Sequence, residues 1–135
     1  MDLQGFLMED VLPPREETLI LSERFGGPFK VAGVSEEENA ALRAACRRRS
    51  ENGVAFDRER YLKKLAAAAV REPDLKDAAL QQSWGVLGEE ALLSKMLTAG
   101  EFAKLLAAVE RVCGFGAPDG RKNALKKVSA GETAS

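Results

Sequence analysis

Histidine is absent from all 135 residues of the sequence. Without imidazole the chain cannot assemble a Ser-His-Asp or Cys-His nucleophile, nor a zinc site that uses a histidine ligand. It also lacks the side chain that most often transfers protons near neutral pH. Chemistry based on carboxylates, lysine or oxygen ligands needs a constellation, and the sequence contains no phosphate-binding loop, dinucleotide fingerprint, CxxC pair or calcium-loop pattern. We therefore predict that the protein is not an enzyme and binds neither a cofactor nor a metal.

Cysteines, net charge and long apolar runs are also scarce. Two cysteines, Cys46 and Cys113, are too few for a secreted disulfide framework, and we expect both to be reduced. The net charge of −1 gives no general attraction to nucleic acid or to a membrane surface. No apolar run approaches the ~20 residues of a membrane span. Residues 1–10 carry acidic groups where a signal peptide needs positive charge, so we expect a soluble, cytoplasmic protein.

Aromatic residues make up only 6% of the chain, so Leu, Val and Ala must fill most of its core. The length fits a single domain. We predict an irregular lead-in at residues 1–17 and one globular domain at 18–116. Residues 117–135 are rich in Gly, Ala, Ser and Lys, which is typical of a flexible tail.

Two β-prone segments lie near the start of the predicted domain. Residues 18–22 (TLILS) and 29–34 (FKVAGV) flank a turn cluster, Phe-Gly-Gly-Pro, at 25–28. This pattern predicts a β-hairpin over 18–34. Because a two-stranded hairpin is marginal alone in water, it must pack on the helices or pair with another chain.

The helical part begins at Ser35, which forms a capping-box pattern with Glu38. Acidic residues occupy the first turn of this predicted helix, and Arg47–Arg49 fall in its last turn, so the charges complement the helix dipole. Asn52-Gly53 ends the segment. This explanation of the arginines is favoured over the alternative, a phosphate-binding role.

The next helix has the clearest signals. Asp57 is placed as its N-cap, Phe56 can pack on Tyr61 as a hydrophobic staple, and Pro73 closes it. A short helix over about 75–83 should follow.

Two further helices complete the domain. The segment Gly85–Gly88 predicts a turn, and 89–97 a helix after it. Thr98 and Glu101 form a second capping box, and Gly114 is placed to end the last helix. The predicted fold class is α+β and predominantly α, with an N-terminal β-hairpin packed on a bundle of about four to five short helices.

Single residues give weak functional signals. Asp74 and Asp77 are spaced i, i+3, but acids at helix starts are common, so we assign them no catalytic or metal role. Trp84 is the one tryptophan of the chain. It could anchor its turn in the core or face a partner, and the core is the default expectation. The apolar helix stripes are likewise core before they are binding surface.

The segment Pro73–Val86 (PDLKDAALQQSWGV), with 87–115 after it, resembles the XkdN-like family of phage tail assembly chaperones. These proteins are encoded by tailed phages and by PBSX-like defective prophages of Gram-positive bacteria. The resemblance rests on the Pro-Asp-Leu start, the aromatic-Gly-Val turn at 84–86 and the leucine-rich stretch at 97–115. It extends upstream to about Leu19. Trp84 departs from the tyrosine that is commoner in the family, and the second strand of the hairpin is shorter and less aromatic than usual.

The resemblance implies a non-catalytic chaperone that binds the tape measure protein and keeps it soluble while tail tube subunits polymerise around it. It implies a location in the bacterial cytoplasm and absence from the mature virion. The tail tube protein is a further implied partner, through a longer frameshifted product. With the apolar stripes, the resemblance selects these candidate client-binding residues: Trp84, Leu92, Leu93, Met96, Phe102, Leu105 and Leu106. Self-association is left open.

The alternative is a small nucleic-acid-binding regulator of phage or prophage origin. It would use Arg47–Arg49 and three tail lysines, Lys122, Lys126 and Lys127. The balanced net charge and the lack of a recognisable helix-turn-helix or aromatic stacking surface speak against it.

Overall fold

The computed structural model describes residues 2–115, and the predicted tail at 117–135 lies outside this part. Helix predominates over strand, at 47% against 17%, which confirms the predicted α+β class. The elements in chain order are η1 (Met8–Asp10), β1 (Glu16–Leu19), β2 (Phe29–Ala32), α1 (Glu36–Ala45), β3 (Arg47–Ser50), β4 (Gly53–Phe56), α2 (Arg58–Ala69), β5 (Val70–Glu72), α3 (Ala78–Ser83), α4 (Glu89–Met96) and α5 (Ala99–Cys113).

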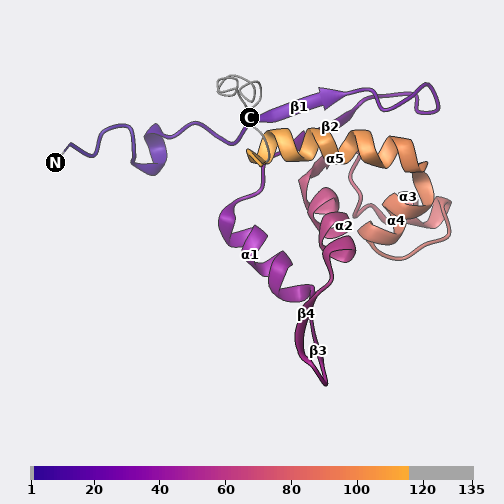
Figure 1. Ribbon diagram of the computed structural model, residues 1–135. Helices are drawn as coiled ribbons and strands as arrows, with labels where there is room; N and C mark the ends of the chain where they lie inside the picture. The colour runs from indigo at the N-terminus through magenta and orange to yellow at the C-terminus, as the bar shows by residue number, and fades with distance from the viewer. Residues whose placement is uncertain (1, 116–135) are drawn as a thin grey trace, which may run out of the picture.

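The predicted N-terminal hairpin is present. Strands β1 and β2 pair antiparallel, from Glu16 opposite Ala32 to Leu19 opposite Phe29, so the first strand begins earlier than predicted. A third strand, β5, pairs with the other edge of β2 and was not predicted. Helix α5 lies along the sheet in Figure 1 and contacts β1 and β2. The helix therefore supplies the cover that the isolated hairpin lacks.

The core forms where α2 meets α1, α4 and α5. Aliphatic side chains fill most of it, as the scarcity of aromatic residues predicts, and Phe29 of β2 is the one buried aromatic residue among the described residues. Leu65 on α2, Leu92 on α4 and Leu105 on α5 are each at most 1% exposed. Trp84 is partly buried and packs against this cluster, which agrees with core anchoring of its turn.

Polar caps determine where most of the helices begin. The side chains of Ser35 and Asp57 accept hydrogen bonds from the backbone N–H groups three residues later, which gives Asp57 its predicted N-cap and Ser35 one half of its predicted capping box with Glu38. The ring centroids of Phe56 and Tyr61 lie 5.5 Å apart, which agrees with the predicted staple. Helix α3 is shorter than predicted, because Asp77 caps it through the amide of Leu80.

Helix α5 shows both of its predicted ends. Thr98 and Glu101 form the complete reciprocal capping box at its start. At the other end Gly114 adopts the left-handed conformation, with φ of 79°, which glycine tolerates at little cost. These caps fix the length of the helix that covers the sheet.

The prediction for Arg47–Arg49 is wrong. Helix α1 ends at Ala45, and the three arginines begin strand β3, which pairs with β4 across the two-residue turn Glu51–Asn52. The Asn-Gly signal is common to helix ends and to hairpin turns, and all eight strand residues are exposed. Strand β3 (Arg47–Ser50) contains no apolar residue, so no alternation of apolar and polar residues reveals it.

Glu101 is the one buried charged side chain among the described residues, at 5% exposed. Its carboxylate accepts hydrogen bonds from the hydroxyl of Ser22 and from the amide of Thr98, and it forms an ion pair with Arg24. The chain that follows the hairpin's first strand is thereby tied to the start of α5. The hydrogen bond from Ser22, then that from the Thr98 backbone, holds the pKa of the Glu101 carboxyl below its ordinary value.

This lowered pKa predicts a pH dependence of stability. The carboxylate stabilises the fold fully above the pKa that it has in the unfolded chain, about 4.3, and the contribution is lost as the pH falls through the lower folded-state value. We expect Glu101→Gln to lower the melting temperature at pH 7 and to flatten its decline in acid. Thermal melts from pH 7 to pH 3 measure both effects. Parallel curves for the two proteins would contradict the assignment.

Gly33 marks a close approach between the sheet and α5. A Cβ added at Gly33 would lie 2.6 Å from the carbonyl oxygen of Val112 and 3.3 Å from the Cβ of Pro14. Because backbone must move to relieve this contact, Gly33→Ala should lower the free energy of unfolding by about 1–3 kcal/mol. Gly27→Ala is the matched control, since no atom lies within 4 Å of its added Cβ. Equal free energies of unfolding for the two variants in urea titrations would refute the close approach.

Candidate functional site

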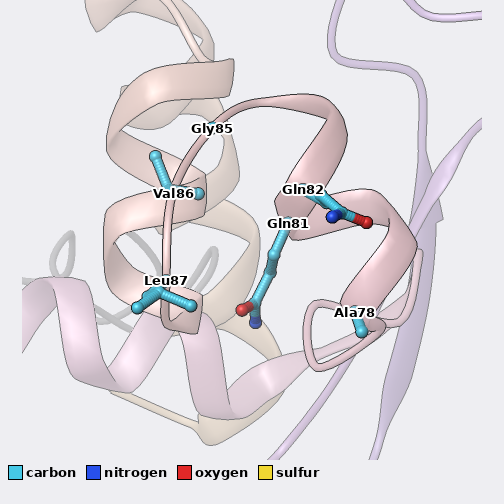
Figure 2. Close-up of a pocket in the computed structure, with 6 residues that line it drawn as sticks. All are labelled: Ala78, Gln81, Gln82, Gly85, Val86 and Leu87. Atoms are coloured by element: carbon cyan, nitrogen blue, oxygen red, sulfur yellow. The ribbon is translucent and has the colours of Figure 1, made fainter.

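A groove of about 600 Å³ opens between α3 and the turn that follows it. Figure 2 shows Ala78, Gln81 and Gln82 on the helix side, with Gly85, Val86 and Leu87 on the turn side. Most of these side chains offer apolar atoms, and the exposed side chain of Gln82 offers an amide. Such a surface suits the apolar side chains of a peptide, with a few hydrogen bonds to fix its orientation.

The groove is held open by Gln81. Its side-chain amide N–H donates to the carbonyl of Leu75 at 2.8 Å, and its amide oxygen accepts from the backbone N–H of Gly88 at 3.0 Å. The same residue's backbone carbonyl accepts from the N–H of Val86 at 3.1 Å. One side chain therefore joins the segment before α3 to the turn after it.

Two glycines shape the turn. Gly85 and Gly88 have φ of 70° and 99°, a region that other residues rarely adopt. Between them Val86 is partly buried, whereas Leu87 is 91% exposed. Leu87 therefore projects from a fixed turn and adds its apolar side chain to the lining of the groove.

Four of the seven candidate client-binding residues lie in the core. Leu92, Leu93 and Leu105 are 0% exposed and Met96 is 5% exposed. They can contact a client only if α4 and α5 separate from the rest of the fold. Because the sequence shows the same apolar stripe for a core and for a binding face, it could not distinguish these uses.

The other three candidates, Trp84, Phe102 and Leu106, are partly buried. Phe102 lines a smaller hollow of about 240 Å³, which Lys63, Ser94 and Leu97 also line. Trp84 is the C-cap of α3 and precedes the lining residue Gly85 in the chain, but it packs against the core cluster and is not among the residues that line the groove. Phe102 lies at the separate hollow.

Sequence reasoning missed Gln81, Val86 and Leu87. The available signal was the pair of glycines at 85 and 88, which sets two apolar residues on a tight turn. The role of Gln81 had no local signal, because its partners Leu75 and Gly88 lie six and seven residues away.

Residues 2–115 contain no group of three or more His, Cys, Asp or Glu side chains placed to hold a metal ion. Asp74 and Asp77, the paired acids of the sequence, accept hydrogen bonds from the backbone of Lys76 and Leu80. Both carboxylates therefore stabilise the turn before α3 and the start of the helix. Cys46 and Cys113 are free thiols, Cys46 being buried.

The family of phage XkdN-like tail assembly chaperone proteins matches residues 3–128 of the sequence. The chain belongs to this family. Membership in the XkdN-like chaperones assigns the protein to phage tail assembly, through interaction with tail proteins, and indicates a non-enzymatic role. Five of the six residues that line the groove lie in the Pro73–Val86 segment that carries the resemblance.

A solved structure shares the fold of this XkdN-like chaperone. The crystal structure of the protein YqbN, a structural genomics target, superposes with a TM-score of 0.75 at 19% sequence identity. The match covers 86% of this chain and 98% of YqbN. No curated protein matches the sequence. Each helix in the described part is too short or too polar to span a bilayer.

Proposed function

We propose that this chaperone binds the tape measure protein through the α3 groove and keeps it soluble until the tail tube forms around it. The observation that carries the proposal is the groove itself, where Leu87 stands 91% exposed on a turn fixed by Gln81. A tape measure protein is a long, largely helical chain, whose apolar stripes need cover before the tube encloses them.

The groove fits such a client in its chemistry. A helix presents apolar side chains at three- and four-residue spacing, which can contact Leu87 and the apolar atoms of Ala78 and Val86. Gln82 is exposed at the rim and offers an amide that can donate and accept hydrogen bonds. A groove of this size contacts only a small part of a helix, so it binds weakly. Weak binding suits a chaperone that must release its client when tube subunits arrive.

The buried stripe has a different role in this proposal. Leu92, Leu93, Met96 and Leu105 belong to the core cluster on which Trp84 and Val86 pack, and they support the turn from inside. The client is therefore held on the surface of an intact fold. Recruitment of the tail tube protein is a second, later contact, which the family resemblance supports.

Affinity purification tests this contact. Tagged full-length chaperone is mixed with purified helical segments that together cover the cognate tape measure protein. We expect one or more segments to be retained, and a fluorescent probe on the turn to report their binding. Failure to retain any segment, with the chaperone folded by circular dichroism, would overturn the proposal.

A further inference from the structure

The N-terminal arm, residues 2–12, is an exposed apolar segment with acidic charge. Met8 is 95%, Leu12 85% and Phe6 79% exposed. Residues 1–14 contain three acidic side chains, those of Asp2, Glu9 and Asp10, and neither lysine nor arginine. Local hydrogen bonds shape the arm, among them one from the Asp10 amide to the Leu7 carbonyl. The arm thus presents apolar and acidic side chains together, without burying them.

The basic hairpin, formed by β3 and β4, has the opposite charge and a similar apolar content. Its register sets Arg47 opposite Phe56 and Arg49 opposite Val54. Directly opposed residues point to the same face of a sheet, so two arginines and two apolar side chains share one face. Val54 is 64% and Phe56 46% exposed.

The charges of both elements lack ion-pair partners within the described residues, although Asp2 and Asp10 accept hydrogen bonds from the backbone N–H groups of Gln4 and Gly5. The five ion pairs there use other groups, and none includes an acid of the arm or an arginine of the basic hairpin. A two-stranded hairpin with all eight strand residues exposed is also marginal in water. Its base is fixed by the amide of Asp57, which donates to the carbonyl of Cys46 at 2.8 Å. Beside this base Phe56 packs on Tyr61 of α2, and the rest of the hairpin gains cover only from outside the domain.

The arm and the basic hairpin leave the domain in different directions. Figure 1 shows the arm extending to one side, beside the β1 end of the sheet, while the hairpin projects below α1 and α2. The two elements therefore do not meet within one copy. We propose that the acidic arm of one copy docks on the basic hairpin of a second copy. The contact joins two different surfaces, so each bound copy still offers a free arm or a free hairpin.

A protein occupant fits the hairpin better than nucleic acid. Val54 and Phe56 share a face with the arginines, and the arm offers Phe6, Leu7 and Met8 to cover them. A phosphate backbone would leave these apolar side chains exposed. Three arginines also neutralise about three phosphates, fewer than the 6–10 contacts of a typical DNA-binding protein.

Charge exchange tests the contact. The hairpin variant Arg47→Glu/Arg49→Glu and the arm variant Asp2→Lys/Glu9→Lys/Asp10→Lys alter exposed residues. Lys76→Glu/Lys95→Glu is a matched control for the hairpin variant, because it makes the same change in net charge at exposed sites elsewhere. Each full-length protein is examined by sedimentation velocity over a range of concentrations, at low and high salt. An equimolar mixture of the hairpin and arm variants is included.

Wild type and control should self-associate as the concentration rises, and added salt should weaken the association. Each charge-reversed variant alone should associate at least about tenfold more weakly. Their mixture should associate again, because the unaltered arm of one meets the unaltered hairpin of the other. A monomeric wild type, or variants that associate like wild type, would overturn the proposal. So would DNA binding that the hairpin variant loses while self-association is unchanged. The α3 groove is a separate surface, so failure here leaves client binding untouched.

Discussion

Replacing Leu92 with alanine should lower the free energy of unfolding by about 2–5 kcal/mol. Leu92 lies on α4 and is 0% exposed, so the shorter side chain leaves a cavity that its neighbours fill only in part. Since small domains are stable by only about 5–15 kcal/mol, this loss is a large share of the total. Urea titration followed by circular dichroism measures it.

Leu87→Ala is the control for this prediction. It removes the same atoms five positions earlier, where the side chain is 91% exposed, and should change the free energy of unfolding by less than about 0.5 kcal/mol. Equal effects at the two positions would mean that the buried stripe is not the core. Leu92 and its neighbours would then again be candidates for a client-binding surface.

Leu87→Asp should weaken binding of the tape measure protein by about tenfold or more while leaving the chaperone folded. The substitution sets a carboxylate where an apolar client side chain must pack, and burying that charge without a partner is strongly unfavourable. Because Leu87 is exposed in the free chain, the stability of the chaperone itself should hardly change. Titration of the client segment retained in affinity purification gives the affinity.

Ile20→Asp provides the matched control. Ile20 is a large apolar side chain, 70% exposed, that follows β1 and does not line the groove. The same change of leucine-sized side chain to carboxylate there should leave client affinity within about twofold of wild type. Loss of binding in both variants would point to a general apolar surface in place of the groove.

The most accurate predictions from the sequence rest on local signals. A cap such as Ser35, Asp57 or Thr98 acts within one turn of its own helix, so a few neighbouring residues suffice to identify it. The same holds for Gly114 at the end of α5. The β1–β2 hairpin was also accessible, because two β-prone runs flank a glycine-rich turn.

Pairings between distant segments were missed. Strand β5 has three residues, too few for a periodic pattern, and it forms only because Val70 comes to lie opposite Val31 of β2. The β3–β4 pairing failed for another reason. Arg47–Arg49 satisfy the charge preference of a helix C-terminus. Because every residue of β3 is exposed, the strand has no buried face that would distinguish its sequence from that of a helix end.

The sequence predicts which segment forms the candidate site better than it predicts which residues line it. The Pro73–Val86 segment contains five of the six residues that line the groove, whereas Trp84 within it does not line the groove. The sequence shows which residues form the apolar stripes of α4 and α5. It does not show how deeply each side chain is buried, because burial depends on the elements that pack over the stripe. Leu93 and Leu105 are completely buried, whereas Leu87, which belongs to neither stripe, is 91% exposed.

Co-expression with the full-length cognate tape measure protein tests the central claim most directly. The tape measure protein is produced alone, with the wild-type chaperone, and with Leu87→Asp, and its soluble fraction is measured together with the chaperone that co-purifies. We predict an insoluble client alone, a soluble complex with wild type, and a marked loss of both solubility and co-purification with Leu87→Asp. A client that stays insoluble with the folded wild-type chaperone, and does not co-purify with it, would contradict the account.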